Sequence, residues 1–171
     1  MPRYVALLRA VNVGGTGKLL MSDLSALCRD AGFARVATYI ASGNVVFDSR
    51  LAAAKVKAAL EARLAAHAGK PVGVVVRSAA EMQAILDANP FLDGEPNVTY
   101  AIFLDERPPA DALRHASGRV DEEIRLGRRE IFVYYPHGMG RSKLRIPAAR
   151  PGTARNMNTV AKLAAMAAER S

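Results

Sequence analysis

Residues 34–49, ARVATYIASGNVVFDS, decide the fold that the sequence predicts. Runs of nonpolar and β-branched residues flank Gly43-Asn44, a dipeptide that tolerates the positive φ angles of a tight hairpin turn. The stretch therefore predicts two strands, at about Val36 to Ile40 and Val45 to Asp48. An isolated hairpin is at best marginally stable, so the elements on either side of it determine the architecture.

A strand and a helix are predicted before this hairpin, and a helix and a strand after it. The evidence is β-branched composition for the strands, and nonpolar residues at helical spacing that end at a glycine for the helices. The four elements are a strand at Arg3 to Arg9, a helix over MSDLSALCRDAG (21–32), a helix at about Ala52 to Ala68, and a strand in PVGVVVRS (71–78). The resulting order, β-α-β-β-α-β, is that of a ferredoxin-like unit.

The rest of the chain repeats much of this order. Ser78 and Glu81 form a capping box that predicts a third helix to about Asp87, before Asn89-Pro90. Beyond it the sequence predicts a strand in NVTYAIFLD (97–105), a short helix at Pro109 to Ala116, a hairpin in EEIRLGRREIFVYYP (122–136), and a last helix that begins in TARNMNTV (153–160). We therefore predict an α+β protein of two tandem ferredoxin-like subdomains packed together, residues 1–77 and 97–171, with a connecting helix and loop at 78–96.

Composition narrows the class of protein. Half of the 171 residues are hydrophobic, yet no apolar run approaches the roughly 20 residues that cross a bilayer, so we expect a soluble cytoplasmic protein without a membrane partner. Arg9 interrupts the short apolar run of the N-terminus, which predicts a strand and not a signal peptide. The single cysteine, Cys28, excludes an internal disulfide and fits a reducing compartment. It lies within a predicted helix, where we interpret it as a small buried side chain.

Charge favours an anionic partner. The formal net charge is +8, and the segment from Ile131 to Ala168 has no acidic residue. Its cationic residues are Arg141, Lys143, Arg145, Arg150, Arg155 and Lys162. Such a segment suits a nucleotide, a phosphorylated metabolite, a nucleic acid or an acidic protein. The alternative is compositional bias, because arginine outnumbers lysine 18 to 6 and alanine is abundant.

The stretch AVNVGGTGKLLM (10–21) is a candidate anion-binding loop. It is not a P-loop, because Asn12 stands at the first glycine position and Leu19 replaces the Ser or Thr that follows the lysine. It also lacks the third glycine of a dinucleotide-binding fingerprint. Its backbone N–H groups could line an anion site, or the glycines could simply turn the chain.

Topology brings this loop close to the hairpin turn. A right-handed crossover makes the first two strands parallel, so the loop from Asn12 to Lys18 and the turn from Ser42 to Asn44 should lie at one sheet edge. The predicted polar cluster comprises Arg9, Asn12, Gly14, Gly15, Lys18, Ser42 and Asn44. Convergent polar groups of this kind indicate a ligand site. In the alternative interpretation Ser42 and Asn44 only satisfy backbone groups of the turn.

A second candidate group lies in the basic C-terminal segment. Ser142 and Lys143 are adjacent in the loop between the last hairpin and the last helix. Arg155, Asn156 and Asn158 lie where that helix begins, and backbone N–H groups at such a position favour anions. The alternative for both asparagines is helix N-capping. The three histidines, His67, His115 and His137, show no metal-ligand spacing, and no cofactor is predicted.

Four segments carry a resemblance to a known family: LLRAVNVGG, TYIASGNVVF, GRSKL and GTARNMNTV. They resemble the signature segments of the uncharacterised bacterial family called domain of unknown function 1697, DUF1697. The family's first and last motifs are similar to R-G-I-N-V-G-G and T-R-N-W-N-T-V, so Ala10, Val11 and Met157 depart from them. If the family uses an aromatic stacking surface at that last position, this chain has a thioether there. The resemblance implies the tandem ferredoxin-like architecture and no established activity.

The sequence leaves three functions open. The first is a binding module for a phosphorylated or otherwise anionic small ligand. The second is nucleic-acid binding, which the charge and the ferredoxin-like layout favour but the absence of an exposed aromatic strand pattern disfavours. The third is an enzyme of unknown reaction that uses the glycine loop and the Lys and Arg cluster, with Lys18 or Lys143 as base or nucleophile near Ser42 or Ser142. The oligomeric state is not predicted.

Overall fold

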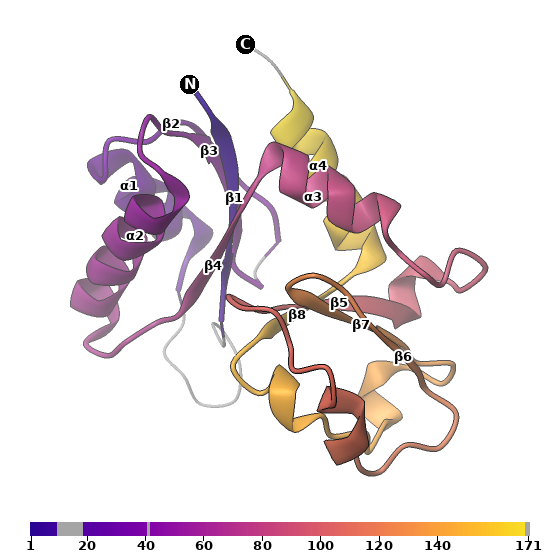
Figure 1. Cartoon of the computed structure of the whole chain (residues 1–171). Coiled ribbons are helices and arrows are strands. Elements are labelled where there is room, and N and C mark those ends of the chain that lie inside the picture. The colour runs from indigo at the N-terminus through magenta and orange to yellow at the C-terminus, as the bar shows by residue number, and fades with distance from the viewer. Residues whose placement is uncertain (10–18, 41, 170–171) are drawn as a thin grey trace. The chain divides into compact units, whose positions relative to one another are not determined.

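The computed structural model describes residues 1–9, 19–40 and 42–169 (Figure 1). The chain divides into two compact units. Unit 1 comprises Met1–Ala84 together with Lys162–Ser171, and unit 2 comprises Ile85–Ala161. Each unit holds one four-stranded sheet whose neighbouring strands are antiparallel, so the protein is α+β, as predicted.

Unit 1 has the order of elements that the sequence predicts. Its elements are β1 (Arg3–Leu8), α1 (Met21–Asp30), β2 (Ala34–Thr38), β3 (Asn44–Asp48), α2 (Ala53–Ala68), β4 (Val74–Ser78) and the start of α3 (Ala79–Asp87). The strands lie in the order β2-β3-β1-β4. β2 begins two residues before the predicted Val36 and ends at Thr38, before Ile40, which adopts a positive φ of 53°. Within the strand, the register with β3 shifts between Ala34 and Ala37, and Arg35 has a positive φ of 49°. A bulge of this kind bends an edge strand.

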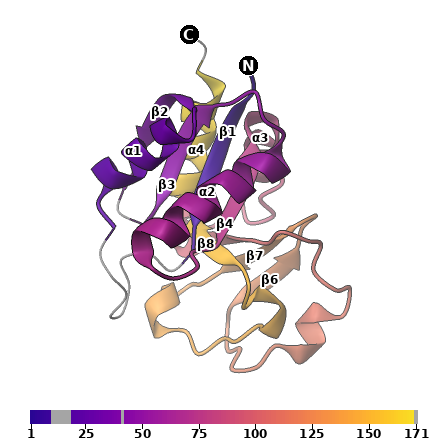
Figure 2. The same cartoon turned by 90° about the vertical axis from the view of Figure 1, so that its left-hand side faces the viewer.

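Helices α1 and α2 lie side by side on one face of this sheet (Figures 1 and 2). Alternate residues of β1 point to one face of a sheet, and Tyr4, Ala6 and Leu8 accordingly pack in one buried cluster with side chains of both helices. The rings of Phe33 and Phe47 stack in the same cluster, with centroids 4.3 Å apart. The nonpolar spacing read from the sequence therefore forms the core of unit 1.

An ionic network in unit 1 joins the first strands to the end of the last helix, α4 (Met157–Ala168). Arg3 Nη1 lies 3.0 Å from Asp48 Oδ1, and Arg35 Nη1 lies 3.3 Å from Asp48 Oδ2. Arg3 Nε also donates to Met166 O at 3.1 Å, and Arg35 Nη2 donates to Glu169 O at 3.2 Å. The last carbonyls of a helix have no intrahelical donors. The two arginines supply donors to carbonyls at this end of α4.

Side chains satisfy backbone groups on the open edge of β4. Lys57 Nζ donates to Val74 O at 2.8 Å, and Val74 N donates to Glu61 Oε2 at 3.1 Å. Ser78 N donates to Glu81 Oε1 at 2.8 Å while Glu81 N donates to Ser78 Oγ at 3.1 Å. This reciprocal pair confirms the predicted capping box. An edge closed by side chains offers little to another strand.

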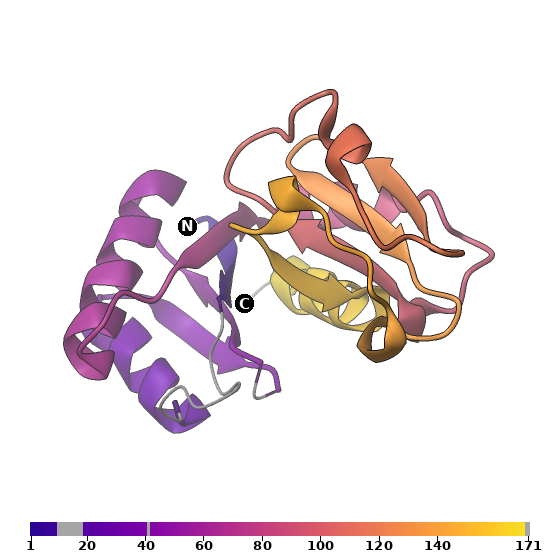
Figure 3. The ribbon, with the colours of Figure 1, turned by 90° about the horizontal axis from the view of Figure 1, so that it is seen from below.

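Unit 2 contains a second sheet with a comparable strand order, β6-β7-β5-β8 (Figure 3). Its elements are the 3-10 turns η1 (Pro96–Val98), η2 (Ala112–His115), η3 (Met139–Arg141) and η4 (Pro147–Ala149), and the strands β5 (Thr99–Phe103), β6 (Glu123–Leu126), β7 (Glu130–Tyr134) and β8 (Thr153–Asn156). β8 leads directly into α4.

Two predictions for unit 2 were wrong. The helix expected at Pro109 to Ala116 is only the short 3-10 turn η2. The predicted order had no strand before the last helix, yet Thr153–Asn156 form β8 and pair with β5, while the helix itself begins within TARNMNTV as predicted. The helix starts at Met157, one residue after the strand ends.

The two sheets share a detail at single residues. Arg77 of β4 lies opposite Val5 of β1, and Arg155 of β8 lies opposite Ala101 of β5. Both arginines are buried, with 1% and 7% of their surface exposed. In each, Nη1 donates to the preceding carbonyl, at 3.2 Å to Val76 O and at 3.0 Å to Ala154 O. In both strands, therefore, a buried guanidinium group donates a hydrogen bond to the carbonyl of the residue before it.

We expect Asp48→Ala to lower the free energy of unfolding by about 3 to 5 kcal/mol, because it leaves the nearly buried Arg3 without its carboxylate. Urea denaturation of the whole chain measures this loss. The matched control is Asp111→Ala, which removes an exposed pair with His115 and should cost no more than about 1 kcal/mol. Equal losses in the two variants contradict the role of Asp48.

We expect Cys28 to resist thiol reagents in the folded protein, because burial raises its pKa to about 12. At pH 8 only about one thiol in ten thousand is then a reactive thiolate. Reaction with dithiobis(nitrobenzoate), followed by absorbance, should be at least about a hundredfold slower in buffer than in denaturing urea. Equal rates in the two solutions contradict this.

Candidate functional site

A cavity of about 380 Å³ lies at one end of the β6–β7 hairpin in unit 2. Glu123 of β6 pairs with Tyr134 of β7, so the residues just before β6 and just after β7 meet at that end. The loop that contains η3 contributes the other wall. The lining residues are Val120, Asp121, Glu122, Tyr135, Pro136, His137, Gly138, Arg141, Ser142 and Lys143.

Glu122 ties the two walls of this cavity together. Only 4% of its surface is exposed. Its Oε2 accepts a hydrogen bond from the Ser142 hydroxyl, and its Oε1 accepts one from Val120 N at 2.7 Å. The hydrogen bond from Ser142, followed by that from Val120, lowers the pKa of Glu122 from 4.5 to about 2. The carboxylate therefore stays charged, and both of its oxygens are engaged.

Tyr135 contributes a hydroxyl that is not used within the described fold. Its surface is only 7% exposed, and its ring meets that of Tyr100 edge-on with centroids 5.6 Å apart. Burial, with the negative charge of Glu122 and the neighbouring Tyr100, raises the pKa of Tyr135 to about 12, so the group remains a donor. The hydroxyl has no hydrogen bond to any residue that the structure describes. Since Tyr135 lines the cavity, this donor is available to a ligand.

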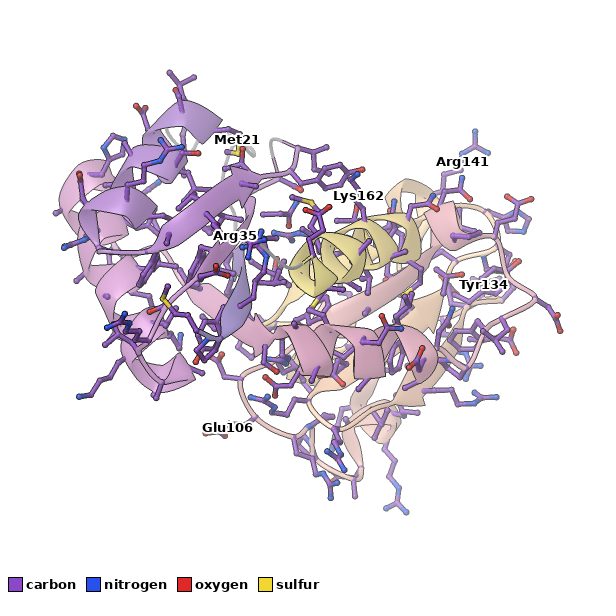
Figure 4. The ribbon with its side chains drawn as sticks, turned by 90° about the horizontal axis from the view of Figure 1, so that it is seen from above. Met21, Arg35, Glu106, Tyr134, Arg141 and Lys162 are labelled. Atoms are coloured by element: carbon purple, nitrogen blue, oxygen red, sulfur yellow. The ribbon has the colours of Figure 1, made fainter. Side chains whose placement is uncertain are left out.

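Two exposed cations complete the polar lining. Arg141 projects from η3 and is labelled in Figure 4, and Lys143 follows two residues later. Within residues 1–9, 19–40 and 42–169, neither side chain has an ion pair or a hydrogen bond. The acid beside them, Asp121, is already paired, since its Oδ2 lies 2.7 Å from His137 Nε2. Gly138 turns the loop here with a φ of 85°.

Glu122 and Tyr135 are poorly suited to acid–base catalysis. A general acid or base works best with a pKa near the operating pH. The pKa of Glu122 lies far below neutrality and that of Tyr135 far above it. Beside the Asp121–His137 pair, the cavity offers one neutral donor and two cations, and such groups can hold an anion.

The first predicted cluster lies in unit 1, and the structure describes part of it. Leu8 N donates to Gly43 O at 2.9 Å, so the end of β1 and the hairpin turn share one sheet edge, as the crossover argument requires. Arg9 and Ser42 are at this edge. Asn44 is fully buried and its Nδ2 donates to Tyr39 O and Ser42 Oγ, both at 2.9 Å. Four predicted residues lie outside the described residues: Asn12, Gly14, Gly15 and Lys18.

The second predicted group is divided between two places in unit 2. Ser142 and Lys143 line the cavity, whereas Arg155, Asn156 and Asn158 do not. Arg155 Nη1 donates to Thr153 Oγ1 at 2.7 Å, and burial lowers the pKa of Arg155 to about 10. Asn156 Oδ1 accepts from Thr159 N at 2.9 Å and so caps α4, while Asn158 is exposed. A ligand-binding role for these residues stays a prediction.

Sequence reasoning missed Glu122 and Tyr135. Their positions depend on the register of the β6–β7 hairpin, which brings residues 13 apart in sequence to one end of the sheet. The hairpin itself was predicted, so extending its register would have indicated both residues. Among the described residues no group of three potential metal ligands occurs, and no described helix could span a bilayer.

Comparisons with known proteins identify a family and a similar structure, and neither description names a function. The family model described as "Protein of unknown function (DUF1697)" matches residues 1–132. A solved structure, titled as that of the conserved bacterial protein SP0830 from Streptococcus pneumoniae, is similar with a TM-score of 0.80 and 26% sequence identity, over 97% of this chain and 98% of that chain. The curated proteins contain no match.

We expect Ser142→Ala to raise the pKa of Glu122 toward 4.5, because the hydroxyl is the largest cause of the low value. In the wild type the charged carboxylate stabilises the fold fully above about pH 4.5, and this contribution is lost as the pH falls toward 2. The variant should therefore lose less stability between pH 6 and pH 3. Carbon-13 titration of the Glu122 carboxyl and urea denaturation measure the two effects. A pKa unchanged in Ser142→Ala, or shifted equally in the exposed control Ser117→Ala, contradicts this.

Proposed function

Because the chain belongs to the DUF1697 family, whose description names no function, we propose its function from the geometry of unit 2: it binds a phosphorylated or otherwise anionic small ligand. The site is the cavity beside η3. The observation that carries the proposal is the hydroxyl of Tyr135: the residue is only 7% exposed and lines a cavity with two cations, and the hydroxyl has no partner in the described residues. An anion in the cavity would supply an acceptor for this donor.

The charges around the cavity support an anion over a cation. Both acids in the lining are engaged, Asp121 by His137 and Glu122 by Ser142 and Val120 N. Arg141 and Lys143 have no such partners in the part of the chain that is described. Hydrogen bonds from cationic groups to anions are shorter and roughly twice as strong as neutral ones. The cavity therefore offers three donors without such partners: the Tyr135 hydroxyl and these two cations.

We also propose a ferredoxin-like architecture for both halves of the chain and a location in the cytoplasm. Residues 1–77 and 97–171 would be tandem ferredoxin-like halves joined by 78–96, and the strand orders β2-β3-β1-β4 and β6-β7-β5-β8 support this. In the second half 3-10 turns stand where the first half has helices. A single buried cysteine is consistent with the cytoplasm, where thiols remain reduced.

Phosphate titration tests the proposed function. We expect added inorganic phosphate, at constant ionic strength, to shift the amide NMR signals of residues 135–143. Arg141→Ala and Lys143→Ala should each weaken binding about tenfold to a hundredfold, because each removes a charge-assisted hydrogen bond worth about 1.5 to 3 kcal/mol. Tyr135→Phe should weaken it as well, by removing the donor and leaving the ring.

The matched control is Arg114→Ala, which removes an exposed cation of unit 2 that does not line the cavity. It should leave phosphate affinity unchanged. Equal affinities in all variants, or no signal shift in residues 135–143, overturn the proposal. A single-stranded oligonucleotide is tested in parallel. If it binds tightly with a steep salt dependence while phosphate does not bind, nucleic-acid binding replaces the small-ligand function.

A further inference from the structure

We infer that the ligand of this cavity carries one anionic group and a nonpolar group, as in a phosphate monoester of an aromatic alcohol, with the nonpolar group covering Val120. This inference rests on the proposed function and names the chemical class of its ligand. The anionic group would lie at Arg141, Lys143 and Tyr135. Val120 lines the same cavity, and 87% of its surface is exposed.

Hydrogen bonds hold Val120 in this exposed position. Its N–H donates to Glu122 Oε1 at 2.7 Å, and Arg119 Nε donates to Glu122 O at 2.6 Å. The backbone from 119 to 122 is therefore fixed, and the β-branched side chain has few rotamers of its own. Val120 consequently presents a rigid nonpolar surface to the cavity. Pro136, also in the lining, adds to that surface.

The size of the cavity supports a ligand larger than phosphate. Small-molecule sites typically measure about 300 to 1,000 Å³, and this cavity measures about 380 Å³. A phosphate held by Arg141 and Lys143 would leave much of that space empty. Covering Val120 with a nonpolar group removes nonpolar surface from water, which is favourable in proportion to the area buried.

The position of the acids argues against a second anionic group. Val120 is followed directly by Asp121 and Glu122, both of which line the cavity. Hydrogen bonds to Ser142 and Val120 hold the pKa of Glu122 at about 2, so it is charged at neutral pH. The charge of Glu122 already acts at Tyr135, so a second anionic group that extended toward Val120 would add to this repulsion, whereas a neutral nonpolar group would not.

Four probes and two variants test this class of ligand. The probes are inorganic phosphate, glycerol phosphate, phenyl phosphate and pyrophosphate, each titrated by NMR at constant ionic strength. We expect phenyl phosphate to bind about tenfold more tightly than glycerol phosphate, since burial of a valine side chain is worth at least that factor. Pyrophosphate should bind no more tightly than phosphate. Val120→Ser should abolish the advantage of phenyl phosphate and leave phosphate affinity unchanged.

The matched control is Leu92→Ser, which alters another highly exposed nonpolar residue of unit 2 that lies outside this cavity. It should change none of the four affinities. If phosphate binds but phenyl phosphate and glycerol phosphate bind equally, the inference fails and the proposed function stands. A tighter complex with pyrophosphate, or an advantage of phenyl phosphate that survives in Val120→Ser, also overturns the inference. If none of the probes binds, the proposed function fails first.

Discussion

The carboxylate of Asp48 is the constraint on which the assembly of unit 1 depends. It lies between two guanidinium groups that would otherwise repel each other, those of Arg3 on β1 and Arg35 on β2. Both arginines also donate to carbonyls at the end of α4, more than 130 residues further along the chain. One buried acid thus fixes the edge of a sheet and the C-terminal turn of a helix together, which is why the two ends of the chain belong to one unit.

The two sheets repeat one arrangement, and their differences explain where the cavity is. β4 and β8 each carry a buried arginine bonded to the preceding carbonyl, and each is followed at once by a capped helix. The connections around the central strands differ, because unit 1 has the helices α1 and α2 where unit 2 has loops with the turns η2, η3 and η4. Loops on a rigid scaffold commonly carry binding groups. In unit 2 such a loop forms the wall of the cavity.

The sequence predicted those features that depend on neighbouring residues. The hairpin at Gly43, the helices of unit 1 and the capping box of Ser78 follow from local periodicity and turn chemistry, and the structure has them. β8 was missed because Thr153–Asn156 has little strand character of its own and gains its ladder from β5, about fifty residues earlier. Composition indicated Ser142 and Lys143. That they line one cavity with Glu122 and Tyr135 depends on sheet register and burial, which composition does not reveal. Burial is also what separates Arg155 from the exposed cations of the same segment.

The cavity is a candidate site because of the exposure, protonation and hydrogen-bond partners of its lining groups. The number of charges alone would not make it one. Unit 2 carries eleven Lys and Arg against ten Asp and Glu, so it has little net charge to attract anions from a distance. Exposed cations such as Arg141 and Lys143 are well hydrated and would by themselves describe an ordinary surface. The hydroxyl of Tyr135 is different, because it is neutral and belongs to a nearly buried ring that packs against Tyr100. Its pKa of about 12 keeps it protonated through the physiological range, so it can donate to an anion without becoming one. A ligand that accepts this hydrogen bond meets an uncharged donor in a fixed position, which two surface cations alone cannot offer.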